Sequence, residues 1–142
     1  MALWLLKTEP DDYSFDRLVK DGKTVWDGVE NNQALMHMRL AKKGDLALIY
    51  HTGDEKAAIG IARLTSNPYA DPLSDNAKLV VFDLVPERKL KAPVTLKAVK
   101  ADPFFASFAL VKNSRLSAMP VTDAQWKKLL SMAEHLAMAL EK

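Results

Sequence analysis

The chain has 142 residues, of which 49% are apolar and 27% charged, the size and composition of one domain with one core. Its 20 Lys and Arg residues exceed its 18 Asp and Glu residues by only two, which excludes a protein that binds nucleic acid by charge alone. The lack of cysteine excludes disulfides, a thiolate nucleophile and a Cys-ligated zinc site, and is typical of a reducing, cytoplasmic compartment.

The N-terminal part predicts three short elements. Residues 2–7 are apolar and indicate a strand buried on both faces. They have neither the leader of a signal peptide nor the length of a membrane span, so we expect no membrane contact. Ser14 can cap a helix over residues 15–20 that ends at Gly22, and residues 24–26 form a brief strand.

A second helix and a second buried strand follow. Either Asn31 or Asn32 can cap the helix, whose apolar positions are spaced helically as far as Ala41, and Gly44 stops it. Residues 46–51 show little alternation of polar and apolar side chains, which again indicates a strand buried on both faces.

The middle of the chain predicts two more strands and a short helix. Residues 57–65 form an apolar strand in which Gly60 indicates a bulge or a close backbone approach. Residues 78–85 form a fifth strand that Pro86 limits, and residues 95–101 are helical.

The C-terminal part contains the clearest helix. Residues 115–119 indicate a last strand, after which Thr122 caps a helix with Gln125 completing a capping box. Val121 can pack against Trp126 as a hydrophobic staple. The apolar residues of this helix fall on one stripe, namely Trp126, Leu129, Leu130, Ala133, Leu136, Ala137 and Leu140.

These elements predict an α+β fold in a single domain over residues 1–142. Five or six short strands alternate irregularly with short helices, which argues against a doubly wound parallel sheet. A small closed or nearly closed barrel with helices around it fits the order better.

The sequence contains no strong catalytic motif, and we expect neither a metal nor a cofactor. Asp11 and Asp12 follow a proline, as turn residues do. His37 and His135 are expected at the surface. His51 ends a buried strand, where it is either a hydrogen-bonded structural residue or a ligand contact.

Aromatic and polar residues, with one glycine among them, lie where three predicted strands end. They are Lys7, Thr8 and Glu9 after the first strand, Trp26, Gly28 and Asn31 after the second, and Tyr50 and His51 on the third. At one rim of a barrel, they would suit a flat heteroaromatic ring that stacks on Trp26 while Glu9 and Asn31 read its edge. Alternatively, Trp4 and Trp26 are both core residues.

The order of short motifs resembles the EVE domain, a member of the PUA-like superfamily. The motifs are WLLKTEP at 4–10, WDGV at 26–29 with Asn31 and Gln33-Ala34, KGD at 43–45, YHT at 50–52 and, more weakly, RLS at 115–117 and PVT at 120–122. The resemblance implies a pseudobarrel of five or six mostly antiparallel strands. It also implies a monomeric, non-enzymatic reader whose pocket, built from the eight strand-end residues, binds a modified base flipped out of DNA or RNA.

Charge is distributed unevenly along the chain, with a net −3 over residues 1–30 and +6 over residues 88–115. Glu30 stands where the family pattern has a basic residue, and Leu35-Met36 replace a polar pair. Glu30 would repel phosphate. The basic residues expected to contact phosphates are Lys7, Arg39, Lys42, Lys43 and Arg115.

Two other functions remain open at this point. A small hydrolase or deaminase would use Glu9 or His51 as a general base. A protein-interaction module would use Phe104, Phe105 and Phe108, which then have to form an exposed apolar patch.

Overall fold

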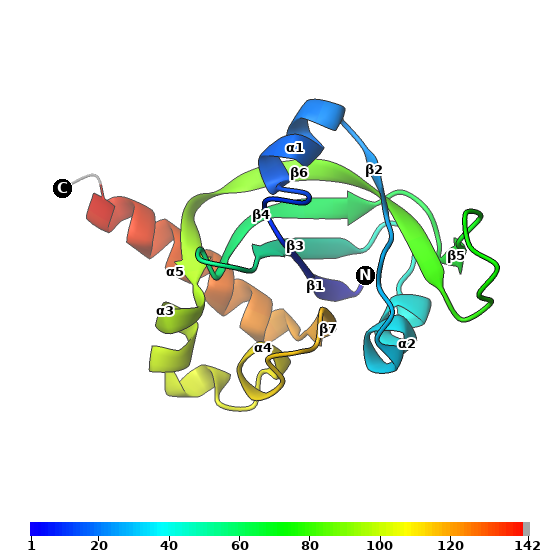
Figure 1. Cartoon of the computed structure of the whole chain (residues 1–142). Helices are drawn as coiled ribbons and strands as arrows, with labels where there is room; N and C mark the ends of the chain where they lie inside the picture. Colours follow the sequence, from blue (N-terminus) through cyan, green and yellow to red (C-terminus); the bar gives the residue numbers. More distant parts are fainter. Residues whose placement is uncertain (141–142) are drawn as a thin grey trace.

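The computed structural model describes residues 1–140, which form one curled mixed sheet with helices around it (Figure 1). The strands are β1 (Leu3–Thr8), β2 (Thr24–Trp26), β3 (Leu46–His51), β4 (Ala57–Leu64), β5 (Tyr69–Ala70), β6 (Val80–Thr95) and β7 (Ala118–Val121). The helices are α1 (Phe15–Asp21), α2 (Asn32–Leu40), α3 (Leu96–Ala101), the 3₁₀ turn η1 (Pro103–Phe105), α4 (Ala109–Lys112) and α5 (Asp123–Leu140).

The strand order β2-β6-β4-β3-β1-β7 confirms the α+β fold and makes the sheet a half-barrel. β1 pairs parallel with β3, and the other pairs formed by the described strands are antiparallel. The sheet has seven strands, more than the five or six predicted, because Tyr69–Ala70 adds a two-residue strand to β6. The edge strands β2 and β7 lie at opposite ends of this order, so the barrel stays open between them.

The N-terminal elements form where the sequence predicts them. Ser14 Oγ accepts the Arg17 N–H at the start of α1, and Gly22 closes this helix in a left-handed conformation with φ of 80°. Of the two candidate caps of α2, Asn31 has the role, because its Oδ1 accepts the Ala34 N–H.

Gly60 on β4 marks a close approach, as predicted. A Cβ atom at this position would lie 2.4 Å from the ring of Phe15, which is completely buried. Only glycine therefore lets the first turn of α1 lie against the sheet.

The prediction that Pro86 ends the fifth strand is wrong. β6 continues to Thr95, and Pro86 pairs with Ala62 where the register with β4 shifts. A bulge tolerates a residue without an N–H, so the proline bends the strand instead of ending it. The last strand also lies further along the chain than predicted, at Ala118–Val121, with Pro120 on the edge strand β7.

The C-terminal helix α5 begins with the predicted capping box. Gln125 N–H donates to Thr122 Oγ1 at 3.1 Å, and Thr122 N–H donates to Gln125 Oε1 at 2.9 Å. Trp126, Leu129 and Ala133 are buried, whereas Leu130, Leu136 and Ala137 are half-buried. Packing of the inner face of α5 against β6 thus closes one side of the core.

Candidate functional site

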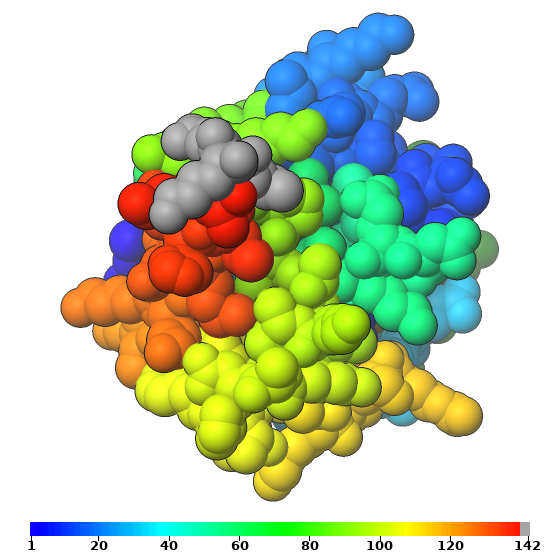
Figure 2. Space-filling model, turned by 90° about the vertical axis from the view of Figure 1, so that its left-hand side faces the viewer, coloured from blue at the N-terminus to red at the C-terminus, as the bar shows by residue number. Residues whose placement is uncertain are grey.

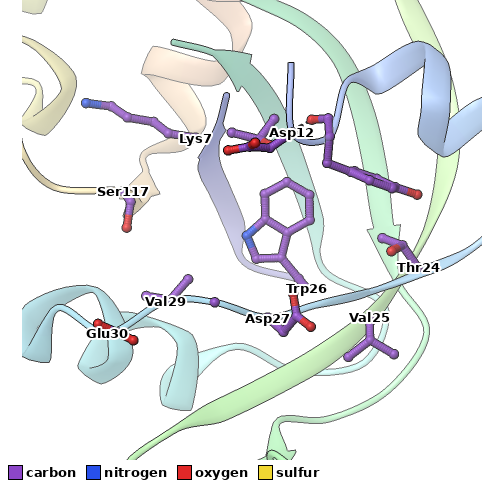
Figure 3. Close-up of a pocket in the computed structure, with 12 residues that line it drawn as sticks. Lys7, Asp12, Thr24, Val25, Trp26, Asp27, Val29, Glu30 and Ser117 are labelled. Carbon is purple, nitrogen blue, oxygen red and sulfur yellow. Dashed lines mark hydrogen bonds between the residues drawn. The ribbon is translucent and has the colours of Figure 1, made fainter. Parts of the chain in front are cut away.

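A cavity of about 420 Å³ opens between the end of β1 and the edge strand β2 (Figure 3). It lies in the gap of the half-barrel, because β2 provides one wall while Lys7, Thr8 and the residue before β7 provide the other. The lining residues are Lys7, Thr8, Asp12, Tyr13, Thr24, Val25, Trp26, Asp27, Gly28, Val29, Glu30 and Ser117.

Backbone contacts hold the two walls in place. Lys7 N–H donates to Ser117 O at 2.9 Å, which ties β1 to the segment before β7. Thr8 Oγ1 donates to Tyr13 O at 2.7 Å, which folds the turn after β1 back over the cavity. On the other wall, Gly28 has φ of 77°, a conformation that bends the chain away from β2 and favours glycine.

Trp26 forms the apolar wall of the cavity. In Figure 3 its indole lies at the centre of the lining, with Ser117 and Val29 on the side of the ring nitrogen. The side chain is 6% exposed, which is too little for a whole ring face to be free for stacking in this conformation. The cavity therefore reaches an edge of the indole.

Carboxylates dominate the charge of the lining. Asp12, Asp27 and Glu30 stand against one cation, Lys7. Burial lowers the pKa of Lys7 and raises the pKa of Tyr13. Carboxylates accept hydrogen bonds and repel phosphate, so the cavity suits a ligand that presents N–H groups.

Four of the eight predicted pocket residues, Lys7, Thr8, Trp26 and Gly28, line this cavity. Glu9 and Asn31 lie outside the lining. Glu9 Oε2 accepts a hydrogen bond from Thr52 Oγ1 at 3.2 Å, and the Asn31 oxygen caps α2 at 3.0 Å. Both side chains, predicted to read a base edge, are hydrogen-bonded within the protein.

His51 is a buried structural residue, 5% exposed. Its Nε2 accepts the Phe15 N–H at 3.0 Å, so the ring proton is on Nδ1, which lies 3.1 Å from Glu55 Oε1. Of the two roles considered for His51, a hydrogen-bonded structural residue or a ligand contact, the structure shows the hydrogen-bonded one. The ring fixes the start of α1 on the sheet.

Tyr50 lines a second cavity of about 270 Å³ on the other side of Lys7. The Lys7 ammonium lies 5.8 Å from the centre of the Tyr50 ring and donates to Ser114 O at 2.9 Å. Burial raises the pKa of Tyr50. Lys7 lines both cavities and thus stands between them.

Sequence reasoning missed several lining residues. Asp12 was interpreted as a turn residue, which it is, but the turn also brings it to the cavity. Asp27 follows Trp26 directly at a predicted strand end, but the predicted pocket does not include it. Ser117 is far away in sequence and reaches the site through the pairing of β1 with β7, which no local pattern indicates.

The predicted phosphate contacts do not line either of these two cavities, apart from Lys7. Arg39 donates to Lys78 O at 2.6 Å, and Lys42 and Lys43 follow α2. Arg115 lies in the segment between Ser114 and Ser117, which line the second and the first cavity.

The phenylalanines do not form the patch that a protein-interaction module requires. Phe105 and Phe108 are buried in the core, and only Phe104 is exposed, at 48%. His135 is at the surface, as expected, whereas His37 is half-buried, and burial lowers its pKa.

Residues 1–140 lack the features of two other classes of function. No helix in this range has the length and apolar character to cross a membrane. No cluster of three or more His, Asp or Glu side chains in the described part of the chain is arranged to hold a metal ion.

Comparison with known proteins places these features in a family. Residues 2–132 match the sequence profile of the EVE domain. Human thymocyte nuclear protein 1 is 29% identical over 165 aligned positions, which cover 92% of this chain and 73% of the human protein.

Solved structures agree with the fold. An NMR structure of a Rhodopseudomonas palustris protein is 42% identical, with a TM-score of 0.89 and 96% of this chain and 95% of that chain covered. The human THYN1 protein, in a crystal structure with DNA containing 5-methylcytosine, is 26% identical with a TM-score of 0.85, and 94% of this chain and 98% of that chain are covered.

Proposed function

Because the chain belongs to the EVE domain family, we propose that it reads a modified nucleobase in DNA or RNA by taking the base into the cavity beside Trp26. The observation that carries this proposal is the acidic, tryptophan-walled cavity in the open side of the half-barrel. It is supported by the human relative of the same fold, whose crystal structure contains DNA with 5-methylcytosine.

The lining chemistry fits a base better than a phosphate. Cytosine and adenine carry exocyclic amino groups, which donate hydrogen bonds to carboxylates. Asp12, Asp27 and Glu30 supply such acceptors, and Trp26 and Val29 supply apolar surface for a ring or a methyl group. We assign edge reading to these carboxylates instead of to Glu9 and Asn31.

The placement of Glu9 and His51 argues against an enzyme that uses either of them as its general base. A general base needs a free lone pair within reach of the substrate. Neither Glu9 nor His51 lines the cavity, and both side chains are hydrogen-bonded within the protein. Monomeric state and cytoplasmic location stay predictions from the sequence.

Filling the cavity tests the proposal without disturbing the core. Ser117 points to the cavity from the segment before β7 (Figure 3), so Ser117→Leu adds apolar volume where the base would lie. We expect a loss of binding to a 5-methylcytosine oligonucleotide of at least tenfold, measured by fluorescence anisotropy, because the ligand and the leucine compete for one space.

Ser107→Leu provides the matched control, since Ser107 is exposed and outside both cavities. This variant should bind like the wild type. If Ser117→Leu binds the oligonucleotide as tightly as Ser107→Leu does, the base does not enter this cavity.

A further inference from the structure

We infer that the second cavity, on the far side of Lys7, binds a phosphate group of the strand whose base enters the first cavity. This inference rests on the proposed function for the identity of the strand. It assigns phosphate contacts to Lys56 and Lys100, which the family motifs in the sequence do not indicate.

The second cavity combines an apolar floor with a basic rim. Leu96, Leu110 and Val111 form the floor together with Tyr50. Lys7, Lys56 and Lys100 come from β1, from the turn between β3 and β4, and from the last turn of α3. Figure 2 shows the segments around residues 52–60, 96–100 and 112–117 side by side on one face of the molecule.

The three lysines of this rim form no ion pairs in the described part of the chain. Three carboxylates lie near the rim. Glu9 accepts a hydrogen bond from Thr52, and Glu55 lies 3.1 Å from His51 Nδ1. Asp54 lines a neighbouring cavity with Lys56 and Lys100. None of these carboxylates forms an ion pair with a lysine of the rim. Three lysines around one cavity repel one another, and a bound anion relieves this repulsion.

The backbone of the rim is held in place. Lys56 has φ of 45°, an uncommon left-handed conformation for a residue with a side chain. Its carbonyl accepts the Leu96 N–H at 2.7 Å, which links the turn to the start of α3. The backbone of Lys56 is therefore tied to the start of α3, and an anion does not have to order the turn that carries this lysine.

The two cavities differ in charge as the two parts of a nucleotide do. The first is lined by three carboxylates and one lysine, and the second by three lysines. A base with amino groups fits the first, and its phosphate is repelled there. Lys7 lines both cavities, so a phosphate attached to a base in the first cavity can lie on the basic side of Lys7.

The test measures how binding to a short DNA duplex with one 5-methylcytosine depends on salt concentration. The same measurement on the duplex without the methyl group is the comparison. The variant is K56Q/K100Q, and the matched control is K112Q/K127Q, which removes two exposed lysines outside both cavities. Loss of one phosphate contact should make the slope of log K against log salt less steep by about 0.9. Affinity at 0.1 M salt should then fall about eightfold relative to the wild type, if the two proteins bind equally at 1 M.

The ratio of affinities for methylated and unmodified duplex should stay unchanged in K56Q/K100Q, because phosphate contacts position a strand without reading it. A wild-type slope in this variant overturns the inference, whatever the methyl preference. A reduced slope in a protein without methyl preference contradicts the reading of 5-methylcytosine and leaves the phosphate site standing.

If the duplex does not bind at all, inorganic phosphate replaces it as the probe, titrated against chloride at constant ionic strength. Saturable NMR shifts at Gly53, Lys56 and Ser114 that vanish in K56Q/K100Q support the anion site. Absence of these shifts in the wild type overturns it.

Discussion

Trp4 and Trp26 have the same exposed fraction, 6%, but their surroundings differ. Trp4 Nε1 donates to Asp45 Oδ2 at 2.9 Å, and the same carboxylate accepts the N–H groups of Ala2 and Lys42. Asp45 is 3% exposed, so Trp4 satisfies a buried charge. Trp26 instead presents an indole edge to the first cavity.

This difference predicts that the same substitution, Trp to Phe, affects base binding at position 26 and leaves it unchanged at position 4. Trp4→Phe should lower the free energy of unfolding by about 2 kcal/mol, because Asp45 loses a donor, and leave affinity for the base unchanged. Trp26→Phe should weaken binding of the base, because it reshapes the cavity wall. Urea unfolding and oligonucleotide binding, both measured on each variant, check this. Equal affinities of the two variants would contradict the assignment of Trp26.

Single residues also mark the limit of prediction from sequence. The sequence predicts the candidate site at the strand ends, and four of the residues predicted there, Lys7, Thr8, Trp26 and Gly28, line the first cavity. The inward hydrogen bonds of the other polar candidates were not predictable. They depend on partners such as Phe15 and Thr52, which lie 36 and 43 residues away from His51 and Glu9.

At the scale of elements, the sequence predicts a helix start correctly where a single capping residue determines it. The caps of α1, α2 and α5 were read from Ser14, the two candidate asparagines and Thr122. The strand predicted from the sequence is shorter than β6, because a proline inside a strand usually ends it. Only the pairing with β4 shows the bulge that accepts Pro86. The two-residue strand β5 likewise exists through its pairing with β6.

The capping box of α5 predicts a measurable contribution to stability. Thr122→Ala removes the acceptor of the Gln125 N–H and should lower the free energy of unfolding by about 1 kcal/mol. Ser131→Ala, at an exposed position inside the same helix, is the control and should have no unfavourable effect. Chemical denaturation distinguishes the two, and equal stabilities of both variants would show that the cap contributes nothing.

At the scale of the whole molecule, the net charge of +2 conceals two cavities of opposite character. The acidic N-terminal part supplies Asp12, Asp27 and Glu30 to the first, and Lys100, from the basic stretch, lies at the second. With few phosphate contacts, binding should depend only weakly on salt and draw its selectivity from one base.

The most direct test of base reading is the affinity of the wild-type protein for two DNA duplexes that differ in a single 5-methyl group. Burial of one methyl group in the cavity is worth about 0.8 kcal/mol, so the methylated duplex should bind about fourfold more tightly. Ser117→Leu should abolish this preference. Equal affinities of the wild type for both duplexes would contradict the reading of 5-methylcytosine, and equal affinities across a wider set of modified bases in DNA and RNA would contradict the reader function itself.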